Sequence, residues 1–91
     1  MYTDRLPPQD IGAEESVVGS VLLDGDSITK ITSFLKPDDL YGEKNRWCYD
    51  ACLALFSRGE AINQVTVAHE LSIHYRLEKI GGSPYLSDLV N

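Results

Sequence analysis

The stretch between Gly42 and Gly59 constrains the fold more than any other part of this sequence. Its apolar side chains cover most of a helical wheel and leave one narrow polar strip. A helix that is apolar nearly all round is buried, so we predict that residues 43–58 form a central helix around which the chain packs. Gly59 stands where a helix-ending glycine belongs. The apolar set is Trp47, Cys48, Tyr49, Ala51, Cys52, Leu53, Ala54, Leu55 and Phe56.

This central helix carries both a predicted core and a solvent-facing strip. We expect Trp47, Cys52 and Leu55 to lie in the core, because they fall within the apolar arc. In the polar strip, Arg46 and Asp50 stand four residues apart, and side chains at that spacing are neighbours on a helix surface. These two residues can therefore form an ion pair on the exposed side of the helix.

Turn and cap residues divide the rest of the chain into further short helices. Ser, Asp and Asn favour helix starts, proline marks starts and ends, and apolar residues recur at helical spacing in each segment. One of these helices carries Val67, Ala68, Leu71 and Tyr75 on its predicted apolar face. The predicted helices span residues 11–23 after a cap at Asp10, 28–35 after a cap at Asp26 and before Pro37, 63 or 64 to 75, and 84–90 after a cap at Ser83.

The sequence predicts an all-α fold. No segment alternates apolar and polar residues as a half-buried strand does, so we expect a compact bundle of about five to six short helices around one central helix. Residues 1–10 are predicted to form an extended arm, because Pro7 and Pro8 disfavour a helix there. Residues 11–91 then form a single helical domain, large enough to bury one modest core.

Charge and composition exclude several functional classes. The chain has 8 Lys and Arg against 14 Asp and Glu, a net charge of −6, and its basic residues are scattered. Binding to the nucleic-acid backbone needs clustered basic residues, so we expect no direct grip on DNA by this domain. No apolar run approaches the length of a membrane span, the start lacks a signal-peptide core, and there are only two cysteines. We therefore expect a cytoplasmic protein without membrane contact.

Cys48 and Cys52, together with His69 and His74, raise the question of a zinc site. The two histidines are five residues apart and point in different directions on a helix, which argues against shared coordination. Both cysteines fall in the apolar arc of the central helix, where free cysteine acts as a small buried hydrophobe. We therefore favour buried thiols and predict neither a metal site nor a cysteine nucleophile.

The sequence offers no catalytic group and no cofactor-binding motif. A phosphate-binding loop ends in Gly-Lys-Ser or Gly-Lys-Thr, whereas Gly81 and Gly82 are followed by Ser83 and Pro84. Glu14 alone is unusual, since the helical wheel places it among apolar side chains. A general acid with a raised pKa is one interpretation. We favour a carboxylate that accepts hydrogen bonds inside the domain, because no second catalytic group is near it in sequence.

Two further features point to close contacts. Gly19 lies inside the first predicted helix, where glycine costs about 1 kcal/mol relative to alanine, so we expect a neighbouring helix of the same domain to approach it closely. Ile73 falls on the polar side of its helix, and Val65 lies on that side as well. Single exposed apolar residues are common, but these two are the best candidates for a partner interface.

Taken in order, several motifs of this chain resemble those of the N-terminal domain of DnaB-type replicative helicases. The resemblance runs from Leu6 to the end of the chain, and the ordered set is specific although no single motif is. Asn45 stands where the family often has His, and Leu40, Cys48 and Asn63 are further departures. The matching motifs are Leu6-Pro7-Pro8, Ala13-Glu14-Glu15-Ser16-Val17-Val18-Gly19, Leu22-Leu23-Asp24, Asp39-Leu40-Tyr41, Tyr49-Asp50-Ala51, Gly59, Val65-Thr66-Val67-Ala68, Glu70-Leu71, and Ile80-Gly81-Gly82 with Tyr85-Leu86.

The resemblance implies a larger protein in which this chain is an accessory domain without catalytic activity of its own. Such helicases carry a RecA-like ATPase domain, which uses ATP and magnesium, and they form a hexameric ring that unwinds DNA in the 5′ to 3′ direction. Their N-terminal domain forms a collar that contacts other helicase subunits, primase and the helicase loader, while DNA is bound only through the parent protein. The family's N-terminal domain ends in a helical hairpin, and we expect this chain to stop before it.

Two other functions stay open on the sequence alone. One is a free-standing helical interaction module, such as the helicase-binding domain of a primase. The other is a small DNA-binding regulator with a helix-turn-helix, which the scattered basic residues disfavour. An ATPase motif encoded downstream would favour the helicase over the free-standing module.

Overall fold

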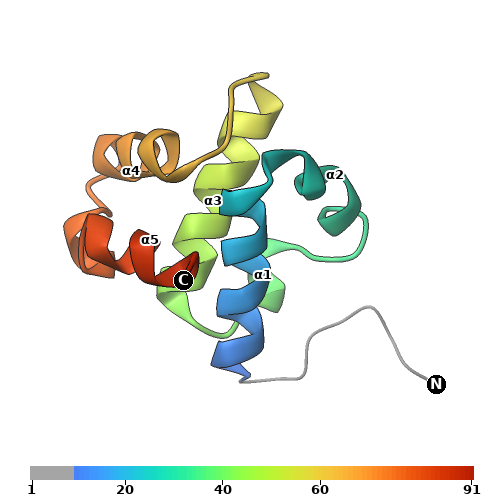
Figure 1. The fold of residues 1–91 in the computed structure, drawn as a ribbon, viewed down its shortest axis with the longest axis horizontal. Helices are drawn as coiled ribbons and strands as arrows, with labels where there is room; N and C mark the ends of the chain where they lie inside the picture. Colours follow the sequence, from blue (N-terminus) through green and yellow to red (C-terminus); the bar gives the residue numbers. More distant parts are fainter. Residues whose placement is uncertain (1–9) are drawn as a thin grey trace.

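The structure, a computed structural model, describes residues 10–91 and is built of helices and connecting turns over that range. The predicted arm falls outside the described residues except at Asp10. The expectation of an all-α bundle of short helices is confirmed (Figure 1). The α-helices are α1 (Ile11–Leu23), α2 (Ile28–Ile31), α3 (Glu43–Ser57), α4 (Gln64–Ile73) and α5 (Ser83–Leu89), and the short 3₁₀ helices are η1 (Gly25–Ser27), η2 (Pro37–Asp39) and η3 (Glu78–Ile80).

Helix α3 lies at the centre, as its apolar wheel predicts. Helices α1, α2 and α4 each pack against it (Figure 1). Cys52 and Leu55 are buried, which confirms two of the three predicted core residues, whereas Trp47 is only partly buried. Tyr49 takes a central place instead, and its hydroxyl donates a 2.8 Å hydrogen bond to the carbonyl oxygen of Leu35. The aromatic ring therefore fills the core while its polar end is satisfied.

Helices α1 and α5 meet at Gly19, where the two backbones touch. A Cβ at Gly19 would lie 2.1 Å from the carbonyl oxygen of Leu89, so any larger residue would force the helices apart. The expected approach by a helix of the same domain is therefore confirmed. Gly19 is buried, because α1 is covered by α3 and also by α5. Ile11, by contrast, remains partly exposed at the start of α1.

Capping residues stand at the starts and ends of several helices, as the sequence indicates. The Asp10 side chain accepts a 2.9 Å hydrogen bond from the amide of the third residue of α1. At the start of α4, the Asn63 side chain accepts hydrogen bonds from the amides of Val65 and Thr66, which satisfies two of the free N–H groups of a helix start. Gly59 has a φ of +72° just after α3, the conformation expected of a helix-ending glycine.

Two predicted caps are wrong, each by one position. Ser27 rather than Asp26 occupies the N-cap of α2, and the side chain of Asp24 caps η1 instead. Gly82, with a φ of +75°, rather than Ser83 occupies the N-cap of α5. In the first case a 3₁₀ turn precedes the helix, and in the second a left-handed glycine does. In both cases the start of the helix depends on the conformation of the preceding backbone, which the preference of Asp or Ser for the N-cap position does not reveal.

The ion pair that helical spacing allows between Arg46 and Asp50 does not form. The Arg46 side chain turns back along the chain and donates hydrogen bonds to the carbonyl oxygens of Leu40 at 3.0 Å and Tyr41 at 2.9 Å. Asp50 faces Arg76 instead, with 3.8 Å between the charged atoms. These partners come from other parts of the fold, so helical spacing within α3 does not reveal them.

The segment predicted as one helix over residues 28–35 folds as the single-turn α2 followed by turns. Ile28 and Leu35 are both buried, so the apolar positions serve the core although the helix ends at Ile31. Pro37 opens η2, in agreement with its predicted role as a break in the helical segment.

Helix α4 ends two residues earlier than predicted, and this moves Tyr75 out of the core. Tyr75 is 84% exposed and has a φ of +59°, a region that bulky residues seldom occupy. Its amide donates to the carbonyl of Ser72, and the amide of Arg76 donates to the carbonyl of Leu71. Tyr75 therefore occupies the left-handed position at a helix end that glycine usually takes. The predicted burial of its ring is wrong, because the chain leaves the helical path before that position.

Replacing Leu55 by Ala is expected to lower the free energy of unfolding by about 2–5 kcal/mol, because this leaves a cavity in the core. Leu55 is 2% exposed, whereas Phe56, the next residue of α3, is 44% exposed. Phe56→Ala is therefore the matched control and should cost less than half as much as Leu55→Ala. Urea unfolding followed by circular dichroism measures both losses. Equal losses would contradict the central position of this face of α3.

Replacing Tyr75 by Gly is expected to raise the free energy of unfolding by up to about 1 kcal/mol, because glycine adopts a positive φ without steric cost. Tyr75→Ala also removes the exposed ring but retains the Cβ, so it should not stabilise the domain. Thermal unfolding of the two variants side by side gives the comparison. A melting temperature of Tyr75→Gly at or below that of Tyr75→Ala would show that the backbone here is not strained.

Candidate functional site

Val65 and Ile73, the two predicted interface residues, both lie on the outer side of α4. Val65 is 78% exposed and Ile73 is 53% exposed, while Val67 and Leu71 of the same helix are buried. Val65 is the second residue of α4 and Ile73 the last, which separates them by about 12 Å along the helix at 1.5 Å per residue. The structure therefore leaves both side chains accessible but does not gather them into one patch.

The surroundings of these two residues differ. Val65 borders shallow hollows, one lined by Leu22 and residues 63–66 and another lined in part by Leu86. Ile73 is followed two residues later by the exposed Tyr75, just beyond the end of α4. We call Ile73 and Tyr75 the apolar tip of α4. The contribution of Tyr75 does not follow from the sequence, because its exposure depends on where the helix ends, and helix ends are poorly marked in a sequence.

The buried carboxylate of Glu14 joins α1 to the loop before α3. The amide of Tyr41 donates to its Oε2 at 2.5 Å, and the amide of Gly42 donates to its Oε1 at 3.0 Å. The Nδ2 group of Asn45 lies 3.4 Å from the same Oε1. The predicted internal donors of Glu14 are therefore confirmed. With both oxygens engaged by N–H donors, the carboxylate serves as an acceptor that holds the loop in place.

Asn45 extends this hydrogen-bond network to α5. It is buried, and its Oδ1 accepts a 2.6 Å hydrogen bond from the hydroxyl of Tyr85. Burial raises the pKa of Tyr85, which keeps this hydroxyl protonated and able to donate. A Cβ at Gly42 would lie 3.1 Å from the Nδ2 of Asn45 and 3.3 Å from the Oε1 of Glu14, so a larger residue there would crowd the network. The residue at position 45 thus links Glu14 to Tyr85 across three helices.

A second polar cluster, which was not predicted from the sequence, joins α3 to α4. Glu70 is buried and accepts a 2.6 Å hydrogen bond from the Nη2 group of Arg58, while the Nε2 of His74 lies 3.2 Å away. Arg58 also pairs with Glu60 at 2.9 Å. The hydrogen bond from Arg58 holds the pKa of Glu70 below its ordinary value. In the sequence, only the spacing of Glu70 and His74, four residues apart on one helix, could have indicated this cluster.

Cys48 and Cys52 are buried thiols, as predicted. Burial raises the pKa of each to about 12, so both stay protonated near neutral pH and are poor nucleophiles. His69 and His74 are exposed. Within residues 10–91, no three metal-ligating side chains come together at one place. In the same part of the chain, no helix is long and apolar enough to cross a membrane.

Replacing Glu14 by Gln is expected to lower the free energy of unfolding by about 1.5–3 kcal/mol, because one acceptor oxygen becomes an NH₂ group that faces buried N–H donors. Glu43→Gln removes a charge from the exposed first turn of α3 and should cost less than about 1 kcal/mol. Urea unfolding of both variants tests the role of the network. If the two substitutions cost the same, the carboxylate of Glu14 does not hold the loop as described.

Comparison with known proteins shows similarity over nearly the whole chain. The family model of the DnaB-like helicase N terminal domain matches residues 6–91. The chain is 42% identical over 91 residues to the replicative DNA helicase DnaC of Bacillus subtilis (strain 168), covering 100% of this chain and 20% of that protein. It is 45% identical over 87 residues to the replicative DNA helicase DnaB of Mycobacterium leprae (strain TN), covering 96% of this chain and 14% of that protein.

A solved structure is similar as well. The crystal structure of the N-terminal domain of DnaB helicase from Mycobacterium tuberculosis matches with a TM-score of 0.88 and 46% identity, over 93% of this chain and 61% of that chain. This chain spans a fifth or less of the length of the two curated relatives named above, so its similarity to them concerns one domain. Family match, sequence identity and fold agree, and the chain belongs to the DnaB-like helicase N-terminal domain family.

Proposed function

We propose that this domain is part of the collar of a replicative DNA helicase and acts by binding proteins rather than by catalysis. The exposure of Val65 and Ile73 on α4 is the observation that carries the proposal. The partners we propose are other subunits of the helicase ring, primase and the helicase loader. DNA would be bound by other parts of the helicase, because a net charge of −6 gives this domain no general attraction for phosphates.

The chemistry of unwinding is assigned, in this proposal, to a RecA-like domain of the same helicase. ATP and magnesium would bind in that domain and drive 5′ to 3′ movement along DNA. The present domain would support assembly of the hexameric ring and bring primase or the loader to it in the cytoplasm. The names of the relatives, both replicative DNA helicases, support this assignment.

An apolar contact at α4 would act as one part of a larger interface. Stable protein interfaces bury about 1,200–2,000 Å² in total, which is more than two side chains supply. A few residues nevertheless carry most of the binding energy of an interface. The apolar tip of α4 offers Ile73 together with an exposed tyrosine, a residue type enriched at interfaces. We therefore take the tip as the first place to test.

The two alternative functions are less well supported. A free-standing primase module is disfavoured, because the relatives reported above are named as helicases. A DNA-binding regulator is disfavoured by charge, because the acidic residues outnumber the basic ones.

The test is Ile73→Asp in a chimaeric helicase, in which this chain replaces the matching segment of the Bacillus subtilis relative. We expect primase-stimulated unwinding or ring assembly to fall at least about fivefold, because a charge enters an apolar contact. The melting temperature of the isolated domain should change by less than about 2 °C, because Ile73 is 53% exposed. Helicase assays, gel filtration and thermal unfolding provide these measurements.

The matched control is Ser33→Asp, which adds the same charge at an exposed position after α2. It should leave both unwinding and ring assembly unchanged. Loss of domain stability in Ile73→Asp would mean that this side chain belongs to the core. Unchanged activity in Ile73→Asp would place the contact elsewhere and refute the role of the tip.

A further inference from the structure

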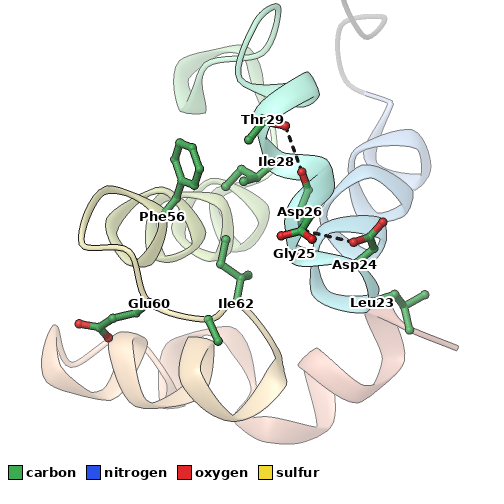
Figure 2. A pocket seen from close by; sticks show the side chains of 10 residues that line it. Leu23, Asp24, Gly25, Asp26, Ile28, Thr29, Phe56, Glu60 and Ile62 are labelled. Carbon is green, nitrogen blue, oxygen red and sulfur yellow. Dashed lines mark hydrogen bonds between the residues drawn. The ribbon is translucent and has the colours of Figure 1, made fainter.

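A groove lies between the end of α1, η1 and the loop that joins α3 to α4 (Figure 2). It encloses about 310 Å³ and is lined by ten residues. Figure 2 shows Ile28, Phe56 and Ile62 around its middle, with Asp24 and Asp26 along one rim. Glu60, which pairs with Arg58, is the one lining residue shared with the polar networks described above, and the proposed contact at the tip of α4 involves other residues.

Tight packing of backbone against side chain fixes the base of the groove. A Cβ at Gly25 would lie 3.0 Å from the carbonyl oxygen of Ile62 and 3.1 Å from its Cβ. The η1 turn therefore rests directly on the loop after α3, and Ile28 behind it is buried in the core. The turn and the loop therefore pack directly against each other at the base of the groove.

Large apolar side chains remain exposed along the groove. Leu23 is 70% exposed and Phe56 is 44% exposed, and Ile62 is only partly buried. Isolated exposed apolar residues are ordinary, but these three line one concave site. Apolar surface gathered at a concave site and bordered by polar residues is typical of an interaction site.

The rim of the groove is acidic. Asp24, Asp26 and Glu60 are exposed, and none of the ten lining residues is basic. Glu60 already pairs with Arg58 at 2.9 Å. The Asp24 side chain accepts a 3.3 Å hydrogen bond from the amide of Asp26, but Asp24 and Asp26 form no ion pair among residues 10–91, so both charges can still attract a cation. An acidic rim around an apolar hollow is complementary to a cationic ligand with an apolar part.

We propose that this groove binds a short peptide segment of a partner protein, with one large apolar side chain flanked by lysine or arginine. The apolar side chain would pack against Phe56 and Ile62, above the buried Ile28, and its cationic neighbours would pair with Asp24 and Asp26. Small-ligand pockets usually enclose roughly 300–1,000 Å³, and this groove, at about 310 Å³, is at the small end of that range. Its size therefore suits one side chain of a peptide better than the surface of a folded protein. This inference goes beyond the proposed contact at α4, since it concerns different residues.

Nuclear magnetic resonance titration of the isotope-labelled chain tests the proposal. The probe is a synthetic peptide with one tryptophan between two pairs of lysines. We expect saturable shifts of the amide signals of residues 23–29 and 56–62. Two comparison peptides, one with glutamates in place of the lysines and one with alanine in place of the tryptophan, should bind at least about fivefold more weakly. Equal binding of all three peptides would overturn the proposal.

A charge reversal inside the groove is compared with the same reversal outside it. Asp26→Lys should weaken binding of the lysine–tryptophan peptide at least about fivefold, because attraction becomes repulsion. Asp88→Lys changes the net charge equally at an exposed position of α5 and should change binding less than about twofold. Phe56→Ala should weaken binding without changing its salt dependence. Amide spectra of the free variants confirm that each retains the fold.

Other results would contradict the groove as a binding site. Equal weakening by Asp26→Lys and Asp88→Lys would show only a general attraction of cations to an acidic chain. Shifts centred on the tip of α4, or no saturable shift at any residue, would equally overturn the proposal. These results would leave the role of Ile73 untouched, because Ile73→Asp is assayed by unwinding and ring assembly.

Discussion

Burial of one broad face of α3, with partial burial of the sides next to it, is the constraint on which the rest of the structure depends. A helix of 15 residues with so little polar surface has to be covered from several directions, and the remaining chain supplies short helices to do so. Helices α1, α2 and α4 cover different sides of it, and α5 reaches the core through Leu86 while its backbone lies on Gly19. Because short covering helices are joined by many turns, glycine and proline recur between the helical segments of the sequence.

Two hydrogen-bond networks hold the covering helices in their positions around α3. The chain from Glu14 through Asn45 to Tyr85 joins α1, α3 and α5, and the cluster of Arg58 and Glu70 joins α3 to α4. Apolar packing alone is non-directional, whereas a buried acceptor demands donors at fixed places. The networks therefore favour one arrangement of helices over others with similar apolar burial.

Because the interior is committed to packing and to these networks, partner contacts of this domain have to be made by its surface. The two surface features differ in chemistry. The tip of α4 is apolar, with Ile73 and Tyr75 exposed, whereas the groove beside η1 combines an apolar hollow with the carboxylates of Asp24 and Asp26. Surfaces of different chemistry select different partners, so the two features would suit the proposed role in an assembly of several proteins.

The sequence by itself determined the helical class, the central place of α3, the buried cysteines and the need of Glu14 for internal donors, because these follow from apolar periodicity and the cost of burying charge. Tertiary structure decided which groups meet. The donors to Glu14 come from a loop 27 and 28 residues away, and Arg46 bonds loop carbonyls rather than Asp50. Tyr75 is exposed because α4 ends early in a left-handed turn. Periodicity describes one element at a time, whereas such contacts depend on how separate elements pack together.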